Sequence, residues 1–419
     1  MRQTYCAGAQ WVHVSTEEQA PQHVQTGLSR ATVLLMAAAT GVTVASLYYC
    51  QPLLDAMSSS FGIAPATAGL LVTFTQVGYA VGLLLVIPLG DLLERRTLIV
   101  WLSAALVAAL LLVAVSPTGT WLFAASLLVG LLSVVAQILV PLAATLAAPE
   151  ERGAIVGTIM SGLLLGILLA RTAAGLLAEA GGWRSVYVVA AACVALLTVA
   201  LRRGLPRSPA MAATTYAGLL RSVGRLIVRE PILRRRMLYG ALAFAQFSVL
   251  WTALTGLLTA APYHYSEAVI GLFGLIGAAG AASAQFAGRH ADKGRALALT
   301  IGFGVLLGLS WIAMAAGRSH LVPLIVGIVV LDLGVQGVHV TNQSQIYTLA
   351  GEARSRVTSA YMTAYFAGGA LGSWSATRVA AADGWRGVCL LGGGLAVVLL
   401  VAVIVGEASL RIRGRQPAS

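Results

Sequence analysis

Twelve apolar stretches, each long enough to cross a lipid bilayer as a helix, dominate this chain of 419 residues. A helix that crosses about 30 Å of hydrocarbon needs roughly 20 mostly apolar residues. Only 10% of the residues are charged, whereas a soluble domain carries roughly 25%. The stretches run over residues 31–50, 65–89, 97–116, 121–147, 154–178, 185–201, 237–258, 267–286, 297–316, 321–350, 357–379 and 387–405. The sequence therefore predicts an all-α membrane protein with twelve transmembrane helices.

A basic segment over residues 202–236, with nine arginines, divides these stretches into two sets of six. Within it, residues 217–229 place leucine, isoleucine and valine on one helical face and Arg221, Arg225 and Arg229 on the other. This pattern is typical of a helix that lies on a membrane surface. We expect a tail over 1–30, six-helix bundles over 31–201 and 237–405, the basic linker over 202–236 between them, and a second tail over 406–419.

The distribution of basic residues predicts the orientation of the chain. Cytoplasmic loops are enriched in Lys and Arg, and 22 of the 27 such residues share one side of the membrane if both termini and the linker are cytoplasmic. Reading residues 31–50 as a cleavable signal peptide would leave eleven spans and spoil the division into six and six, so we reject it. The net charge of +12 could suggest a nucleic-acid partner, but the arginines stand in short clusters without a basic arm. We therefore expect none.

Cysteine spacing gives no sign of a metal site. The four cysteines are scattered along the chain as Cys6, Cys50, Cys193 and Cys389, without the paired spacing of a disulfide framework or a zinc site. We expect them to be packing residues, and we expect no metal and no cofactor.

The two halves of the chain resemble each other at an offset of 202 residues. Gly182-Trp183-Arg184 falls on Gly384-Trp385-Arg386, and Arg152 falls on Arg354. Further matches are Gly69-Leu70 with Gly271-Leu272, Gly166 with Gly368 and, one residue out of step, Asp91 with Asp292. Two parallel six-helix repeats with a cavity between them at the bilayer midplane are a transporter architecture.

Three motifs carry a resemblance to a known family. Residues 87–98, with Gly90, Asp91, Arg95 and Arg96, resemble motif A of the major facilitator superfamily, and residues 288–295 look like a second copy. The glycines at 162, 166 and 175 are similar to the helix 5 motif of drug/proton exchangers, with Arg171 where that motif usually has proline. The resemblance covers residues 31–405. It implies two pseudo-symmetric six-helix bundles and a rocker-switch carrier, most like bacterial inner-membrane drug and metabolite exporters.

Asp332 is the one acidic residue deep within a predicted span. Gln336, His339 and Gln343 follow at +4, +7 and +11 on one helical stripe, with Asn342 beside it. Ionisable groups at bilayer depth are costly and mark transport pathways, so we predict that the stripe lines the cavity and that Asp332 and His339 carry the proton. The alternative is that these groups only tie neighbouring helices together by hydrogen bonds.

Arg171 is the second charge within a predicted span. It could attract an anionic substrate or pair with Asp332, or its side chain could extend to the outer membrane surface. Isolated polar or aromatic residues in other spans, which we expect to contribute to the cavity, are Gln76, Gln137, Gln246 and Tyr49. For Tyr48, Tyr49 and Trp251 the pattern also fits an interfacial aromatic belt.

Charged residues in the motif A loops are candidates for a cytoplasmic gate. The two sets are Asp91, Arg95 and Arg96, and Asp292, Lys293 and Arg295. Charge-assisted hydrogen bonds among them would hold the cytoplasmic side shut and break when it opens. Positive-inside topology alone would explain the basic residues but not the two aspartates.

These features favour a secondary carrier that exports a small amphipathic compound by proton-coupled alternating access. The main alternative is metabolite uptake by symport. An enzyme within the membrane is a different class, because His339 and Ser344 adjoin the face of Asp332, but no hydrolase motif accompanies them. We expect a monomer in a bacterial inner membrane whose partners are the substrate, protons and lipid.

Overall fold

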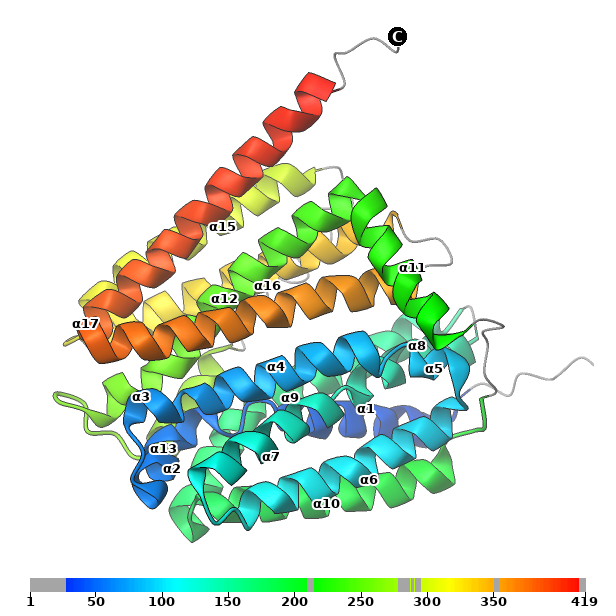
Figure 1. Ribbon diagram of the computed structural model, residues 1–419, viewed down its shortest axis with the longest axis horizontal. Helices are drawn as coiled ribbons and strands as arrows, with labels where there is room; N and C mark the ends of the chain where they lie inside the picture. The colour runs from blue at the N-terminus through cyan, green and yellow to red at the C-terminus, as the bar shows by residue number, and fades with distance from the viewer. Residues whose placement is uncertain are drawn as a thin grey trace, which may run out of the picture.

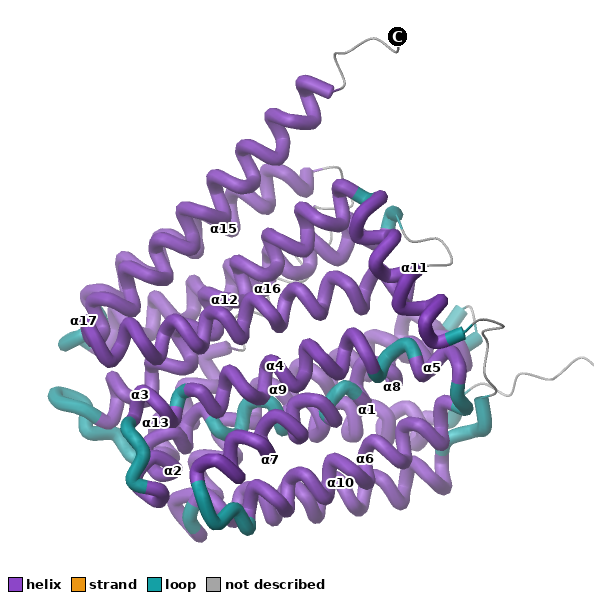
Figure 2. The backbone as a smooth tube through the Cα atoms, viewed as in Figure 1, coloured by secondary structure: helices purple, strands orange, loops and turns teal. Residues whose placement is uncertain are grey.

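The computed structural model describes residues 28–148, 150–208, 215–277, 287, 290, 295–349 and 354–413. Over these residues the backbone consists of helices, turns and short loops, without a strand (Figure 2). The first half contains α1 (Arg30–Ala45), η1 (Gln51–Leu53), α2 (Leu54–Phe61), α3 (Pro65–Ala68), α4 (Leu70–Leu85), α5 (Leu89–Leu92), α6 (Arg95–Ala114), α7 (Gly119–Leu132), α8 (Val135–Leu146), α9 (Arg152–Gly181) and α10 (Trp183–Gly204). After α11 (Tyr216–Arg229), the second half contains α12 (Pro231–Thr259), α13 (Glu267–Leu272), η2 (Phe273–Gly277), α15 (Ala296–Ala316), α16 (Leu321–Tyr347) and α17 (Arg354–Arg413).

Nine helical segments of the described chain are long and apolar enough to cross a bilayer. One of these, Arg356–Gly406, contains the last two expected spans, and α7 and α8 together form another. Two shorter apolar helices, Arg30–Ala45 and Glu267–Gly277, correspond to the remaining expected spans. The all-α membrane fold is therefore confirmed. Residues 278–286 of the eighth expected span lie outside the described residues.

The segment between the halves differs from its expected bounds. The amphipathic helix α11 starts at Tyr216, one residue from the expected 217. However, α12 already begins at Pro231, so the three arginines from 234 to 236 belong to a helix rather than to the linker. Pro231 explains this start, because proline suits the first helical position, where its missing N–H has no partner to lose.

The repeated Gly-Trp-Arg triplet forms the same tight corner in both halves. Gly182 has φ 76° and ψ 164°, and Gly384 has φ 60° and ψ −151°, a region that is essentially restricted to glycine. After each glycine, the tryptophan begins the next helix and its indole N–H donates a hydrogen bond, from Trp183 to Ser60 Oγ at 2.9 Å and from Trp385 to the carbonyl of Met314 at 2.8 Å. The repeat in the sequence is thus a repeat of a helix–helix corner.

Gly182→Ala and Gly384→Ala are each expected to lower the free energy of unfolding by about 1–3 kcal/mol, because a Cβ strains this backbone conformation. Thermal unfolding of the purified protein measures the effect. Gly224→Ala in α11 is the control, since nothing lies within 4 Å of its added Cβ and alanine is the better helix former. Unchanged melting temperatures in both the Gly182 and the Gly384 variant would contradict the claim that these corners require glycine.

Close helix packing at glycine is also repeated between the halves. A Cβ on Gly166 of α9 would lie 2.2 Å from the carbonyl oxygen of Gly41 in α1. At the equivalent place, a Cβ on Gly368 of α17 would lie 2.3 Å from the carbonyl oxygen of Ala241 in α12. The fifth expected span therefore packs directly on the first, as the eleventh packs on the seventh.

The two halves lie side by side, with α11 at one end (Figure 1). In this view the first half, blue to green, lies below the second half, green to red. Helix α4 packs on α17, and α9 packs on α13. Hydrogen bonds between the halves join Thr73 to Ser373 at 2.8 Å, Ser359 to the carbonyl of Leu83 at 2.8 Å, and Thr172 to the carbonyl of Gly271 at 2.9 Å.

Candidate functional site

The guanidinium group of Arg171 lies in an aromatic enclosure between the two halves. Its Nε donates a hydrogen bond to Gln51 Oε1 at 2.6 Å. Its central carbon lies 3.9 Å from the ring centroid of Trp251, 4.9 Å from that of Tyr48 and 5.3 Å from that of Phe247. Only 3% of the residue is exposed. The side chain therefore faces the interface between the halves. The alternative prediction, that it extends to the outer membrane surface, does not describe this structure.

Asp332 of α16 is also buried, with 6% of its surface exposed. A Cβ on Gly277 of η2 would lie 3.0 Å from its Oδ2, so the backbone of η2 comes close to the carboxyl group. The opposite charges of Arg171 and Asp332 attract each other. They do not form a direct ion pair, since Asp91–Arg95 is the one ion pair among the described residues.

Two local features bring these groups together. The packing of α9 on α1 through Gly166 and Gly41 sets Arg171 beside the end of the first span. There, η1 follows a run of turns and carries Gln51, whose carbonyl accepts a hydrogen bond from Thr255 of α12 at 2.7 Å. We call Gln51, Arg171, Trp251 and Asp332 the central polar cluster.

The central polar cluster holds buried polar atoms that have no hydrogen-bond partner among the described residues. These are Gln51 Nε2, Arg171 Nη2 and Asp332 Oδ1, while the indole N–H of Trp251 is directed at the Asp332 carboxyl group as a hydrogen-bond donor. Leaving a buried polar group unpaired costs about 1–3 kcal/mol, and more when the group is charged. Native structures rarely keep such atoms without a reason, which makes the cluster the candidate binding site.

His339 lies further along α16, against aromatic side chains of α17. Its Nδ1 is 3.1 Å from the hydroxyl of Tyr361, and its ring centroid is 4.7 Å from that of Tyr365. The seven residues between Asp332 and His339 correspond to about 10 Å along the helix axis. Gln336 and Gln343 are half-buried on the same helix. The residues of the predicted stripe therefore lie along one helix without forming a single cluster around Asp332.

Asn342 belongs to a polar network inside the second half. Its Oδ1 accepts a hydrogen bond from Arg236 Nη1 at 3.3 Å, and its Nδ2 lies 3.5 Å from the hydroxyl of Tyr361. Arg236 also donates to Thr300 Oγ1 at 3.1 Å. The network ties α12, α15, α16 and α17 together, as the hydrogen-bonding alternative for Asn342 predicts.

The remaining predicted cavity residues take different places. Gln76 Nε2 donates to Ser248 Oγ at 3.0 Å across the interface between the halves, and Gln137 Nε2 lies 3.4 Å from the hydroxyl of Tyr79. Gln246 accepts a hydrogen bond from Trp311 within the second half. Tyr49 packs edge-on against Tyr187 of α10 within the first half. Neither Gln246 nor Tyr49 therefore contacts the central polar cluster, whereas Tyr48 does.

Sequence reasoning does not identify Tyr48, Gln51 and Trp251 as site residues. Tyrosine and tryptophan near the ends of apolar stretches fit an interfacial belt equally well. Gln51 stands just beyond the expected end of the first span, where a polar residue is unremarkable. Its only sequence signal is the proline that follows, which marks a break in the helix.

In the motif A loop of the first half, Arg95 makes both an ion pair and a hydrogen bond to the backbone. Arg95 forms an ion pair with Asp91 at 3.4 Å, and its Nε donates to the carbonyl of Gly90 at 3.0 Å. Arg96 lies by Arg202 and Arg203 of α10. Arg295 is exposed at the start of α15. Asp292 and Lys293 lie outside the described residues.

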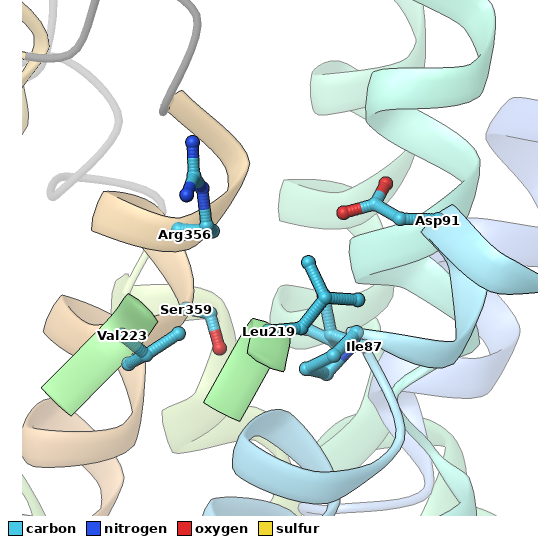
Figure 3. Close-up of a pocket in the computed structure, with 7 residues that line it drawn as sticks. Ile87, Asp91, Leu219, Val223, Arg356 and Ser359 are labelled. Atoms are coloured by element: carbon cyan, nitrogen blue, oxygen red, sulfur yellow. The ribbon is translucent and has the colours of Figure 1, made fainter. Parts of the chain in front are cut away.

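A small cavity at the α11 end separates Asp91 from a basic residue of the other half. Asp91 and Arg356 lie on opposite sides of it (Figure 3). The residues that line it come from the motif A loop, α11 and α17, and are Ile87, Pro88, Asp91, Leu219, Val223, Arg356 and Ser359. Arg356 is thus a candidate counterpart of Asp91 for a gate between the halves.

Glu94 joins the motif A loop to the linker. It caps α6 by accepting hydrogen bonds from the backbone N–H groups of Arg96 and Thr97 and from the Thr97 hydroxyl, and it also accepts one from the N–H of Ser208 at 3.0 Å. Partial burial opposes ionisation, but the hydrogen bonds from Thr97, Ser208 and Arg96 outweigh it and lower the pKa of Glu94 to about 2.

Glu94→Ala is expected to lower the free energy of unfolding at pH 7 by about 0.5–2 kcal/mol, the usual value of a helix cap. Because the pKa of Glu94 is lowered on folding, its ionic contribution is fully present above the unfolded pKa of about 4.3. It is lost as the pH falls from there towards 2. Thermal unfolding at pH 7, 5 and 3.5 should show the difference from the wild type shrinking only at the lowest pH. A difference in stability that stays constant from pH 7 to pH 3.5 would contradict a stabilising role of the ionised Glu94 carboxylate.

Transporters of similar length match most of this chain in sequence. The chain is 52% identical over 374 residues to the uncharacterized transporter YgaY of Escherichia coli, covering 89% of this chain and 95% of the relative. It is 35% identical over 387 residues to a Streptomyces coelicolor protein named as a transporter, covering 91% and 88%. It is 27% identical over 384 residues to the inner membrane transport protein YnfM of Escherichia coli, covering 90% and 89%.

Solved structures show the same fold at low sequence identity. The nucleoside transporter NupG superposes with a TM-score of 0.71 at 14% identity, over 90% of this chain and 99% of the other. A D-xylose-proton symporter superposes with a TM-score of 0.66 at 14% identity, over 88% and 96%. The sequence model of the Major Facilitator Superfamily matches residues 35–373. Together with the twofold helical repeat, this match shows that the chain is a secondary transporter and belongs to the major facilitator superfamily.

Proposed function

We propose that the protein couples the transport of a small amphipathic compound to protons by alternating access, with Asp332 as the protonation site. The observation that carries this proposal is the burial of Arg171 and Asp332 between the two halves. Ionisable groups at bilayer depth are costly and mark ion and substrate pathways. The aromatic rings around Arg171 suit a ligand that is itself partly apolar.

The position of Arg171 favours co-transport of substrate and proton over exchange. While Asp332 is charged, it attracts Arg171 and competes with any other negative partner of the guanidinium group. Protonation of Asp332 removes this competition and leaves Arg171 available to the substrate. Among the described residues, the hydroxyl of Tyr365 on α17 is a further titratable group whose charge would be felt at Asp332. Proton and substrate then bind together, which is the logic of a symporter that works in the direction of uptake.

Export in exchange for protons is the second candidate. It rests on the packing of the α9 glycines, Gly162 and Gly166, against Ala37 and Gly41 of α1, since these glycines resemble the helix 5 motif of drug/proton exchangers. In that case the proton and the substrate would occupy Asp332 in turn. His339 is proposed as a secondary proton group, because its Nδ1 already contacts the Tyr361 hydroxyl.

The membrane environment of the protein is proposed from its relatives and its loops. YnfM is named as an inner membrane transport protein, and we propose the same bacterial membrane here, with both termini cytoplasmic and the monomer as the working unit. The α11 end, with the motif A loop and Arg356, would then be the cytoplasmic side. An enzyme is disfavoured because the family consists of transporters.

Proteoliposomes that contain a trapped pH dye test the proposal. A panel of small amphipathic acids, amines and neutral compounds is added outside, with protein-free liposomes as the control for passive permeation. Co-transport acidifies the lumen, whereas exchange makes it alkaline. A transported compound that moves without any change of lumen pH would refute proton coupling in either form.

A further inference from the structure

We propose, resting on the proton coupling proposed above, that the central polar cluster binds an aromatic carboxylate, with the carboxylate on Arg171 and the ring beside Trp251. The proposed function specifies only a small amphipathic compound, whereas this inference specifies an organic anion. Three observations carry this assignment: the balance of unpaired atoms, the fork geometry of arginine and the row of aromatic rings.

Unpaired donors outnumber unpaired acceptors in the central polar cluster. Gln51 Nε2 and Arg171 Nη2 are buried donors without a partner among the described residues, against the single acceptor Asp332 Oδ1, and the indole N–H of Trp251 is directed at the Asp332 carboxyl group. Each of the four residues is more than nine-tenths buried. A ligand that satisfies this set must bring acceptors, and a carboxylate brings two oxygens with about four lone-pair sites.

Arginine is suited to a carboxylate rather than to a neutral acceptor. Its planar guanidinium presents N–H groups in a fork that matches a carboxylate in two parallel hydrogen bonds. The Nε of Arg171 is already held by Gln51 at 2.6 Å, which fixes the plane of the group. A carboxylate would therefore bind the edge formed by the two Nη atoms, where Nη2 is unpaired. The same positive charge repels a cationic ligand, although aromatic enclosures otherwise favour cations.

A row of aromatic side chains extends from Arg171 along α12 and α17. Phe247 lies 6.0 Å from Trp251 between ring centroids, Phe244 is stacked on Phe247 at 5.3 Å, and Tyr365 is stacked on Phe244 at 4.1 Å. Flat rings prefer offset stacking or edge contacts with other rings. Trp251, Phe244 and Tyr365 of this row are buried in this conformation, so in the proposal the row contacts the aromatic part of the ligand when the two halves separate.

Three probes of nearly equal shape test the assignment on the full-length protein in detergent. They are 3-phenylpropionate, 3-phenylpropanamide and 3-phenylpropylamine, and their binding is followed by thermal shift and by tryptophan fluorescence. We expect the carboxylate to bind at least about ten-fold more tightly than the amide, as the loss of a charged hydrogen bond requires, and the amine not to bind. Equal binding of acid and amide, or tighter binding of the amine, would overturn the proposal.

Variants of Arg171 locate the contact. Arg171→Gln is expected to remove the preference for the acid, and Arg171→Lys to retain only part of it, because lysine keeps the charge but not the fork. The matched control is Arg378→Gln, since Arg378 also lies over a tryptophan ring, Trp374, at 4.6 Å but is exposed on α17. An acid preference that persists in Arg171→Gln, or that is lost in Arg378→Gln, would overturn the assignment.

Failure of this inference can be told apart from failure of the proposed function. If the acid binds through Arg171 but its flux leaves the lumen pH of proteoliposomes unchanged, the substrate class stands and the proton coupling fails. If instead the amine or the amide drives pH-coupled flux and the acid does not bind, the coupling stands and the substrate class fails.

Discussion

Replacing Asp332 with asparagine is expected to abolish proton-driven accumulation of substrate while leaving substrate binding and proton-independent exchange largely intact. Asparagine has nearly the same shape as aspartate but cannot change its charge. In the variant, the attraction that Asp332 exerts on Arg171 is absent at every pH. The site then always resembles the protonated wild type, so a pH gradient cannot drive net transport in either direction.

Accumulation in proteoliposomes under an imposed pH gradient measures the effect, alongside counterflow at equal pH. Asp383→Asn is the matched control, because Asp383 is exposed near the corner at Gly384. It is expected to behave as the wild type in both assays. Accumulation at the wild-type level in Asp332→Asn would remove Asp332 from the coupling mechanism.

A disulfide between positions 73 and 373 is expected to stop transport almost completely. The hydroxyl oxygens of Thr73 and Ser373 lie 2.8 Å apart across the interface between α4 and α17, and the Cα–Cα distance of a disulfide is about 4.4–6.8 Å. Alternating access requires the halves to separate at each end of the interface in turn. A covalent bond near one end would hold the carrier in a single state.

This prediction is tested with Thr73→Cys/Ser373→Cys in a background whose natural cysteines, Cys6, Cys50, Cys193 and Cys389, are replaced by alanine. Transport should fall on oxidation and return with a reductant, and each single cysteine variant should be unaffected by either. Undiminished transport by the cross-linked protein would mean that α4 and α17 do not separate at this position during the cycle.

The positions of the membrane-spanning helices can be predicted from this sequence because few backbone conformations are stable within a bilayer. Backbone groups within hydrocarbon must bond within their own segment, so apolar stretches of this length become helices. The helix over 216–229 is nearly as predictable, since its arginines and apolar residues alternate with a helical period. The corners at Gly182 and Gly384 are visible as a repeated triplet, although their φ values require coordinates.

Which face of each helix points inward is far harder to predict. Spans that are apolar on all sides carry no periodic signal, because lipid and protein interior are equally apolar. Asp332 and Arg171 stand out because a charge cannot face acyl chains cheaply. Tyr49 and Tyr48 are adjacent and chemically identical, yet only Tyr48 lies by Arg171. Arg236 follows two further arginines, and only the structure shows that it turns inward to Asn342.

The presence of one buried basic and one buried acidic residue in the central polar cluster has a consequence for the energy source of transport. In the proposed cycle the empty cluster, with Arg171 and Asp332 both charged, carries no net charge. A bound carboxylate together with one proton leaves the total at zero. An electrical potential does work of about 2.3 kcal/mol per elementary charge for each 100 mV, and here it would act on no net charge in either crossing. Such a carrier is electroneutral, so a potassium diffusion potential should leave its rate unchanged, and only the concentration gradients of protons and substrate should drive it.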